Sequence, residues 1–275
     1  MKDWIGKYCL INGNIQPVDS ILKYLSFSEK SVYEVLRVEQ GVPLFVEDHF
    51  FRLENSFLLC GKKLKIALPE FKGAVTKLVD KNGITEGPVK FVFNTANAGT
   101  DFVAYFMIPH RPSPEEYRSG IKTVTLCESR NNPNAKIWNM HLRETAAGLI
   151  SKNEAYEAIL IDNDGYVTEG SRSNIFFVKG DTVFTPPDEF VLPGITRKKV
   201  IELCRLNGIE IILKRIPLKQ LGTFDSSFLT GTSRKIVPVK YIDDLFFDTN
   251  NKLVRKIMRY FDDLVNSYIL KHKKL

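Results

Sequence analysis

The sequence predicts an α+β fold built in two halves. Short β-forming runs alternate with amphipathic helical stretches, a segment with two prolines among polar residues follows residue 109, and the 275 residues exceed a usual domain of roughly 150. Because two prolines restrict the backbone, we expect an interdomain linker over residues 110–116. The expected parts are a small N-terminal α/β domain over 1–109 and a larger domain over 117–275.

The first half carries mixed strand and helix patterns. β-forming residues cluster at 32–38 and 91–93 and predict strands. Apolar residues recur at helical spacing within 46–59 and 71–79, and residues 102–108 read as a buried strand.

The second half alternates strands with helices and ends in the clearest helix of the chain. Over residues 253–269 the apolar positions keep an i, i+3, i+4, i+7 pattern for nearly five turns. Two further helices are expected at about 139–154 and 196–207. The expected strands are 121–126, 158–161, 174–178, 182–185, 209–212 and 227–229.

Composition excludes several classes of protein. With 44% hydrophobic and 26% charged residues the chain is neither disordered nor collagen-like. No window reaches the roughly 18 apolar residues of a membrane helix, and the N-terminus shows no secretory signal. The four cysteines lack metal-ligand spacing, so we expect buried free thiols, no metal site and a cytoplasmic location. The net charge of +7 is spread along the chain, so neither nucleic acid nor a membrane is an expected partner.

Three polar segments are candidates for chemistry. In 192–197 a glycine-led turn opens a helix, which leaves backbone N–H groups ready for a phosphate, with the Thr196 hydroxyl beside them. Small hydroxyl residues in 230–234 follow an apolar run and can also hold an anion. In 168–174 a carboxylate beside glycine could face a cationic ligand nitrogen. For each segment taken alone, an ordinary polar turn is the more usual explanation.

Taken together, these segments resemble the fold-type IV pyridoxal-phosphate enzymes, which include branched-chain and D-amino acid aminotransferases and aminodeoxychorismate lyase. The resemblance covers most of residues 30–240 and depends on order as well as composition. It is carried by Lys136, Asn139, Glu157-Ala158, Tyr166-Val-Thr-Glu-Gly170, Ser173-Asn-Ile-Phe176, Leu192-Pro-Gly-Ile-Thr-Arg197, Thr230-Gly-Thr-Ser233 and Pro238-Val239.

The resemblance implies a two-domain enzyme with a small N-terminal α/β domain and a larger domain with a barrel-like β core. It implies pyridoxal 5′-phosphate as cofactor and a homodimer as assembly. Lys136 matches the Schiff-base lysine, which condenses with the cofactor aldehyde and later moves a proton. Glu169 matches the partner of the pyridine nitrogen.

The remaining cofactor contacts are implied in the same way. The phosphate is expected to be held by Arg52, by the amides of Ile195 and Thr196, by the Thr196 hydroxyl and by Thr232. A guanidinium suits a dianion because it can bind two oxygens at once.

Three further residues match positions that surround the cofactor in related enzymes. Arg130 and Glu157 match positions where an ion pair steadies the cofactor face. His141 falls near a tyrosine position of some relatives, and a core histidine is an equal alternative.

The substrate side departs from the family pattern. The segment 93–100 lacks the arginine that D-amino acid aminotransferases usually carry there. Arg172 and Arg234 are candidate replacements for binding a substrate carboxylate, and Tyr33 resembles a residue that lines the substrate side. A surface ion pair is the alternative for Arg172.

The expected reaction is ping-pong transfer of an amino group between an amino acid, of D- or branched-chain type, and a 2-oxo acid. The alternative within the family is 4-amino-4-deoxychorismate lyase, which eliminates pyruvate with the same cofactor. The intact Thr-Gly-Thr run at 230–232 favours transamination. A nucleic-acid binder, suggested by net charge alone, is the third hypothesis.

Overall fold

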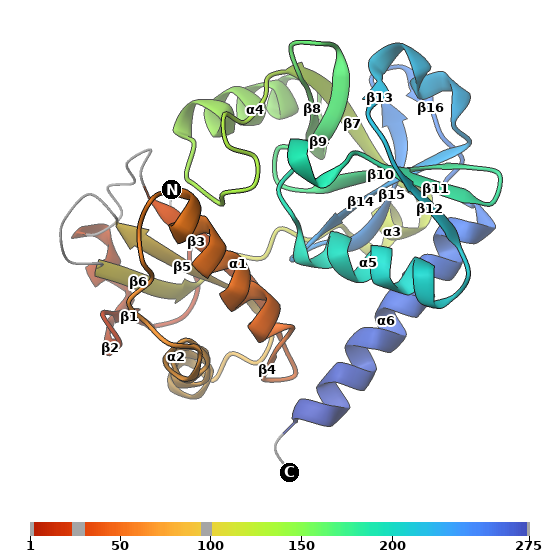
Figure 1. The fold of residues 1–275 in the computed structure, drawn as a ribbon. Helices are drawn as coiled ribbons and strands as arrows, with labels where there is room; N and C mark the ends of the chain where they lie inside the picture. The colour runs from red at the N-terminus through yellow and green to blue at the C-terminus, as the bar shows by residue number, and fades with distance from the viewer. Residues whose placement is uncertain (1–2, 24–30, 95–100, 274–275) are drawn as a thin grey trace. The chain divides into compact units, whose positions relative to one another are not determined.

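The structure is a computed structural model that describes residues 3–23, 31–94 and 101–273. The chain forms two compact units (Figure 1). Unit 1 comprises 1–110, 135–139 and 265–275, and unit 2 comprises 111–134 and 140–264. The domain limits expected from the sequence stay a prediction. A division of the chain into two consecutive domains does not provide for residues 135–139, which belong to unit 1.

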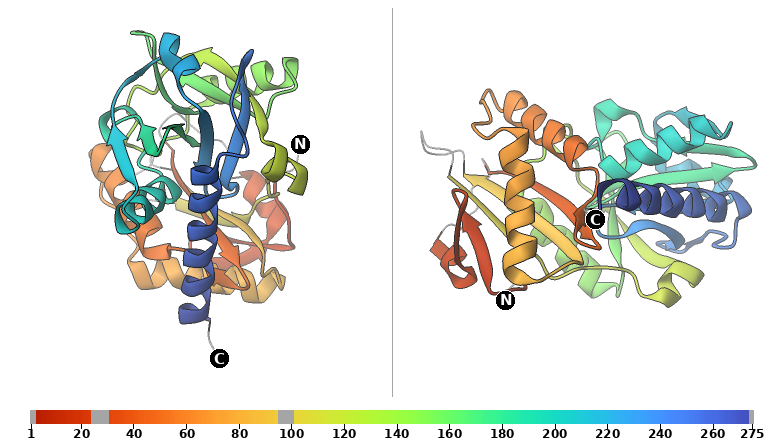
Figure 2. Two further views of the ribbon diagram at one scale, coloured as in Figure 1. Left: turned by 90° about the vertical axis from the view of Figure 1, so that its right-hand side faces the viewer. Right: turned by 90° about the horizontal axis from the view of Figure 1, so that it is seen from below.

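Unit 1 is an antiparallel sheet with two helices on one face (Figure 2). Its strand order is β2-β1-β6-β5-β3-β4. The elements are β1 (Tyr8–Ile11), β2 (Asn14–Pro17), η1 (Val18–Lys23), β3 (Val32–Glu39), β4 (Val42–Pro43), α1 (Val46–Leu59), α2 (Leu68–Asn82), β5 (Gly87–Asn94) and β6 (Asp101–Phe106).

Alternation along β3 decides which side chains meet the helices. Val32, Leu36 and Val38 belong to the core beneath α1 and α2, whereas Tyr33 belongs to a second cluster on the opposite face. Because successive side chains of a strand point to opposite faces, Glu34 lies on the helix side and Tyr33 on the other.

Residues 135–139 pair alongside the N-terminal end of β3. Ile137 forms a bridge with Val32, and the Trp138 amide donates to the Ser31 carbonyl at 2.8 Å. The Trp138 ring packs on the face of the sheet that carries Tyr33. This short segment, which contains Lys136, is therefore held by main-chain bonds at a sheet edge.

Unit 2 is built on a curled, mixed sheet of ten strands. The order is β12-β11-β10-β14-β15-β7-β8-β9-β13, with β16 paired to β15. The strands are β7 (Ile121–Cys127), β8 (Glu157–Ile161), β9 (Tyr166–Gly170), β10 (Asn174–Lys179), β11 (Thr182–Thr185), β12 (Glu210–Leu213), β13 (Ile216–Pro217), β14 (Ser226–Gly231), β15 (Lys235–Ile242) and β16 (Leu245–Phe246).

The helices of the remaining chain are α3 (Pro114–Ser119), α4 (Met140–Lys152), α5 (Ile195–Leu206) and α6 (Lys252–His272), with short turns η2 (Asp188–Phe190) and η3 (Leu218–Thr223). The helix α3 begins within the segment 110–116, which was expected to be a linker. Ser113 caps α3 by accepting the Glu116 amide, and Pro114 occupies the first helical position, where proline is favoured.

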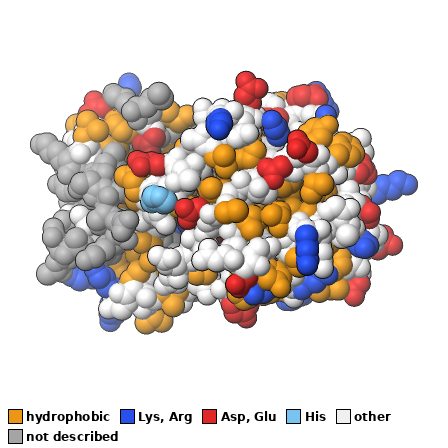
Figure 3. Space-filling view, turned by 90° about the horizontal axis from the view of Figure 1, so that it is seen from above, with side chains coloured by type: hydrophobic (Ala, Val, Ile, Leu, Met, Phe, Trp, Pro, Cys, Tyr) orange, Lys and Arg blue, Asp and Glu red, His pale blue; other side chains and the backbone are white. Residues whose placement is uncertain are grey.

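The structure bears on what composition predicted about the cysteines, membrane helices, metal sites and charge. Cys9 and Cys204 are buried, but Cys127 is exposed, so the expectation of buried thiols is wrong there. Within the described residues, no helix has the length and apolar character needed to cross a membrane, and no cluster of metal-binding side chains occurs. Basic and acidic side chains are interspersed on the face in Figure 3.

Candidate active site

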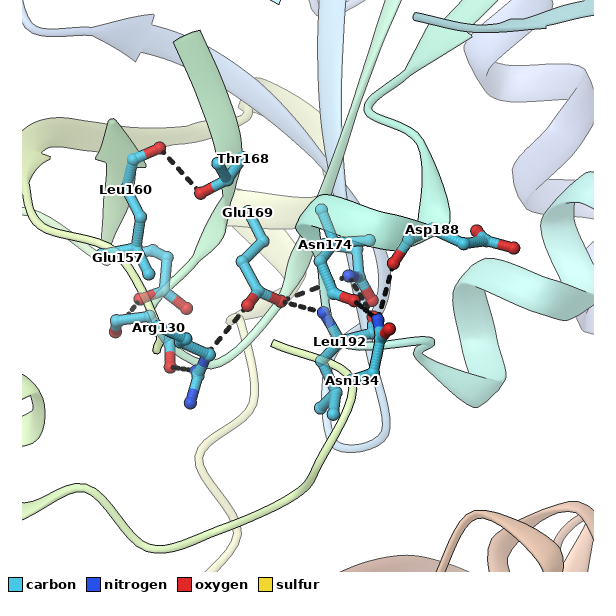
Figure 4. A network of polar contacts seen from close by, with 11 residues as sticks. Arg130, Asn134, Glu157, Leu160, Thr168, Glu169, Asn174, Asp188 and Leu192 are labelled. Carbon is cyan, nitrogen blue, oxygen red and sulfur yellow. Dashed lines mark hydrogen bonds and ion pairs between the residues drawn. The ribbon is translucent and has the colours of Figure 1, made fainter. Parts of the chain in front are cut away.

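Glu169, near the end of β9, carries a buried carboxylate fixed by three donors (Figure 4). Arg130 Nε donates to its Oε1 at 2.8 Å. The Leu192 amide and Asn174 Nδ2 donate to its Oε2 at 3.2 and 3.4 Å. Because the carboxyl group is only 3% exposed, these donors fix its orientation, and they favour negative charge on its oxygens.

The donors around Glu169 are themselves anchored. Arg130 Nη2 donates to the Ser171 carbonyl at 2.8 Å, and Asn174 Nδ2 also donates to the Leu192 carbonyl at 2.8 Å. The carboxylate is therefore attached both to the β9–β10 turn and to the loop before α5.

The start of α5 has the form expected for an anion cradle. Its N-cap is Gly194, and the first amides of the helix, including those of Ile195 and Thr196, have no carbonyl to pair with inside the helix. No acidic residue lies in the first turn. A Cβ on Gly194 would come within 2.0 Å of Asn174 Oδ1, so the close approach of these two segments requires glycine.

A buried hydroxyl lies on the strand against which α5 packs. Thr230, on β14, is fully buried, and its Oγ1 has no hydrogen-bond partner among the described residues. Buried polar atoms are normally paired, so this oxygen is one that a polar ligand would satisfy. Thr232 follows, half-buried, in the β14–β15 turn.

A second buried carboxylate, Glu157, joins the two turns. Its oxygens accept from Ser171 Oγ at 2.5 Å and Ser173 Oγ at 3.1 Å, on the β9–β10 turn. They also accept from Arg234 Nη1, on the β14–β15 turn. Burial alone would raise the pKa of Glu157, but the Arg234 guanidinium and the Ser171 hydroxyl outweigh burial and hold that pKa below its usual range.

This network bears on two expectations. Arg130 pairs with Glu169, and Glu157 pairs with Arg234. Arg234 is 4% exposed and its guanidinium is engaged by Glu157. The sequence could not distinguish these pairings, because all four residues lie far apart along the chain.

In unit 1, Lys136 lies over an aromatic ring. Its Nζ is 4.7 Å from the centroid of the Tyr33 ring, and the Trp138 ring meets Tyr33 edge-on at 5.6 Å. The Lys136 carbonyl accepts the Tyr33 amide at 3.1 Å. The predicted amine and the predicted substrate-side tyrosine are thus brought together.

Arg52 is part of a buried charge cluster with Glu34 and His49. Arg52 Nε and Nη2 donate to the two Glu34 oxygens at 3.0 and 2.5 Å, and His49 Nδ1 lies 3.0 Å from Glu34 Oε1. The edge of the guanidinium formed by Nε and Nη2 is therefore occupied by Glu34 and is not the edge that would meet a phosphate.

The cluster shifts both titratable groups in one direction. Burial alone would raise the pKa of Glu34, but Arg52 and His49 outweigh it and hold that pKa well below its usual range. Burial lowers the pKa of His49, although Glu34 opposes the shift. An ionised Glu34 beside a neutral His49 and a charged Arg52 is the resulting state near pH 7.

Two other predicted residues have exposed side chains. His141 is 73% exposed on α4, 3.8 Å from Glu128, so the alternative of a core histidine is wrong. Arg172 is exposed in the β9–β10 turn. The arginine-free segment 93–100 lies mostly outside the described residues, which omit 95–100.

Sequence reasoning missed Asn174, Glu34, His49 and Ser56 as site residues. Asn174 stood inside a motif already singled out, and His49 lies three residues before Arg52, so their polar character was a usable signal. Glu34 adjoins Tyr33 on a strand, and nothing local indicated that its carboxylate would meet α1.

Comparison with known proteins decides the family. The model of the family described as "Amino-transferase class IV" matches residues 31–242. The chain belongs to this family. D-alanine aminotransferase of Bacillus licheniformis is 30% identical over 228 residues, which are 77% of this chain and 78% of that protein. A putative branched-chain-amino-acid aminotransferase of Methanocaldococcus jannaschii is 30% identical over 263 residues, 87% and 88% of the two chains.

Solved structures of the same class share the fold. The PLP-form of a branched-chain aminotransferase from Thermobaculum terrenum superposes with a TM-score of 0.82 at 23% identity, over 99% of this chain and 97% of that one. The predicted two-part α+β architecture is confirmed. This class IV chain is thus a pyridoxal-phosphate-dependent aminotransferase, as its motifs predicted.

Unit 2 of this aminotransferase fits that cofactor. The α5 start at Gly194 presents unpaired backbone amides that can hold a phosphate, and Thr230 Oγ1 offers a hydroxyl without another partner in the described chain. A buried carboxyl group held by the Arg130 guanidinium suits a protonated ring nitrogen.

Proposed function

We propose that the chain moves an amino group between a D-amino or branched-chain amino acid and a 2-oxo acid, in two half-reactions. Bound pyridoxal phosphate supplies an aldehyde that exchanges for the amine and a ring that accepts electrons. The observation that carries the proposal is the buried Glu169 carboxylate with its three fixed donors.

The residues of unit 2 hold the ring and the phosphate. Glu169 keeps the pyridine nitrogen protonated, and Arg130 keeps Glu169 ionised and directed by donating to Oε1. The amides of Ile195 and Thr196, the Thr196 hydroxyl and Thr232 hold phosphate oxygens, helped by the positive end of the α5 dipole.

The residues of unit 1 supply the amine. Lys136 is the residue that binds the cofactor covalently and moves a proton at its Nζ. The Tyr33 ring beneath that Nζ orients the side chain and excludes water from one side of it. Arg52, held by Glu34, adds positive charge for the phosphate through the edge that Glu34 does not occupy.

The substrate carboxylate is assigned to Arg172. With Arg234 engaged by Glu157, Arg172 is the remaining arginine of the two candidates, and it is exposed in the turn that follows Glu169. Relatives named for D-alanine and for branched-chain substrates have the same identity to the chain, which leaves both donor types in the proposal.

The first test uses the purified holoenzyme. Wild-type protein with pyridoxal phosphate should show the visible absorbance of a lysine-bound cofactor, and borohydride should fix the cofactor on the peptide containing Lys136. A label on another lysine, or none, contradicts the assignment. An amino-acid donor alone should convert the cofactor to its amine form and stop, whereas a lyase would release pyruvate from aminodeoxychorismate with no acceptor present.

Donor identity is tested with both enantiomers of alanine, leucine and valine. Arg172→Ala should raise the KM for the amino acid and leave cofactor absorbance intact. An unchanged KM would remove Arg172 from the substrate site.

We also propose a homodimer, as expected from the family. Phe51 and Leu58, two helical turns apart on α1, are 57% and 71% exposed and form an apolar face suited to a second copy. Light scattering should give twice the chain mass, and Phe51→Glu with Leu58→Glu should give a monomer. A monomeric wild type would refute the assembly.

A further inference from the structure

Ser56 is a fully buried serine in the C-terminal half of α1 whose hydroxyl makes two hydrogen bonds. Its Oγ donates to the Arg52 carbonyl, one turn earlier, at 2.8 Å. The same Oγ accepts the backbone amide of Lys136 at 3.1 Å. A hydroxyl has one donor and two acceptor positions, so one group satisfies both partners.

The Lys136 main chain is thereby held on two sides. Its carbonyl accepts the Tyr33 amide of β3, and its amide reaches Ser56 on the helix that covers the sheet. The Lys136 side chain extends over the Tyr33 ring, on the other face of β3. The hydrogen bond from the Lys136 amide to Ser56 therefore fixes the position of the Lys136 backbone, and with it the position from which the side chain reaches Tyr33.

Helical spacing connects Ser56 to the charge cluster. His49, Arg52 and Ser56 are separated by three and four residues, so they share one face of α1. Serine is a weaker helix former than alanine and competes for backbone groups. A serine at a buried helical position is thus explained by what its hydroxyl binds.

We propose that Ser56 is a positioning residue for Lys136: its hydroxyl links the backbone of the cofactor-binding lysine to the backbone of Arg52. This inference rests on the role proposed for Lys136. Without Oγ, the Lys136 amide loses its partner in a half-buried position and residues 135–139 shift to find another. Displacements of about 1 Å can cost up to about 100-fold in rate.

The test compares three single variants of the holoenzyme. Ser56→Ala removes the hydroxyl, and Ser56→Cys keeps the side-chain shape with a somewhat larger sulfur atom that forms weaker hydrogen bonds. Ser227→Ala is the matched control, because Ser227 on β14 is also buried and, among the described residues, its hydroxyl donates to the Phe176 carbonyl at 3.0 Å. The measurements are kcat and KM of the donor half-reaction, the pH midpoint of the visible band, and the melting temperature.

Both Ser56 variants should lose about tenfold in kcat with little change in KM, and the pH midpoint should move, since a shifted Nζ has a new environment. Ser227→Ala should keep the wild-type kcat and midpoint. Wild-type kcat and midpoint in both Ser56 variants would overturn the inference. A loss in Ser227→Ala equal to that in Ser56→Ala would also overturn it, because the effect would then follow general stability.

Failure of the inference is distinguishable from failure of the proposed function. If wild-type protein carries no borohydride label on Lys136, the function itself fails. If Lys136 is labelled and the Ser56 variants match the wild type, only the positioning role is wrong.

Discussion

Replacing Arg234 with methionine separates a role in the fold from a role in substrate binding. The guanidinium is 4% exposed, and its Nη1 pairs with Glu157, which is 1% exposed. The variant leaves Glu157 with the hydroxyls of Ser171 and Ser173 but without a cation. Removing one partner of a buried ion pair costs about 3–5 kcal/mol.

That cost translates into a measurable loss of thermal stability. At about 2–4 °C per kcal/mol for a unit of this size, the melting temperature should fall by roughly 6–20 °C. Combining Arg234→Met with Glu157→Gln removes both charges and should restore most of the loss, because no unpaired ion remains buried.

Thermal and urea denaturation of the holoenzyme measure the effect, with donor KM measured on the same samples. Arg215→Gln is the control, since Arg215 also pairs with a carboxylate of unit 2, Asp162, but its side chain is 32% exposed. Its loss of stability should be much smaller than that of Arg234→Met, because exposed ion pairs are screened by solvent. An Arg234→Met protein with wild-type stability and a raised KM would refute the reasoning and return Arg234 to the substrate site.

Three further predictions follow from the site. Gly194→Ala should weaken pyridoxal-phosphate binding at least tenfold in a fluorescence titration, because its Cβ would lie 2.0 Å from Asn174 Oδ1; unchanged affinity would contradict the cradle. Arg130→Met should lower kcat about 10- to 100-fold with little change in KM, since Glu169 loses its charged donor, and an unchanged kcat in single-turnover assays would exclude that role. His49 has a lowered pKa, so the unfolded chain binds more protons below about pH 6.5, and stability is present above that pH and lost as the pH falls. Urea midpoints that stay level from pH 7.5 to 5 would contradict the His49 prediction.

Much of the fold was predictable because it depends on local patterns. The helical spacing of 46–59 matches α1, and the turn chemistry of 192–197 placed the start of α5 within a residue. Strand β15 was not predicted, and it contains Pro238 opposite Phe228, inside a sheet where proline is rare. Strand β2 was missed because its residues are mostly exposed and do not alternate.

The sequence by itself determined the family and the cofactor and supplied the residues proposed to carry the chemistry, because motif order and spacing are properties of the chain. Tertiary structure decided which charges and hydroxyls pair. Arg52 meets Glu34 across 18 residues, Arg234 meets Glu157 across 77, and Lys136 meets Ser56 across 80. Hydrophobic periodicity predicts which face of a helix or strand a residue occupies. It does not predict which segment, remote in the sequence, packs against that face. Those pairings follow from how helices and turns dock on the sheets, where burial requires every polar group to find a partner.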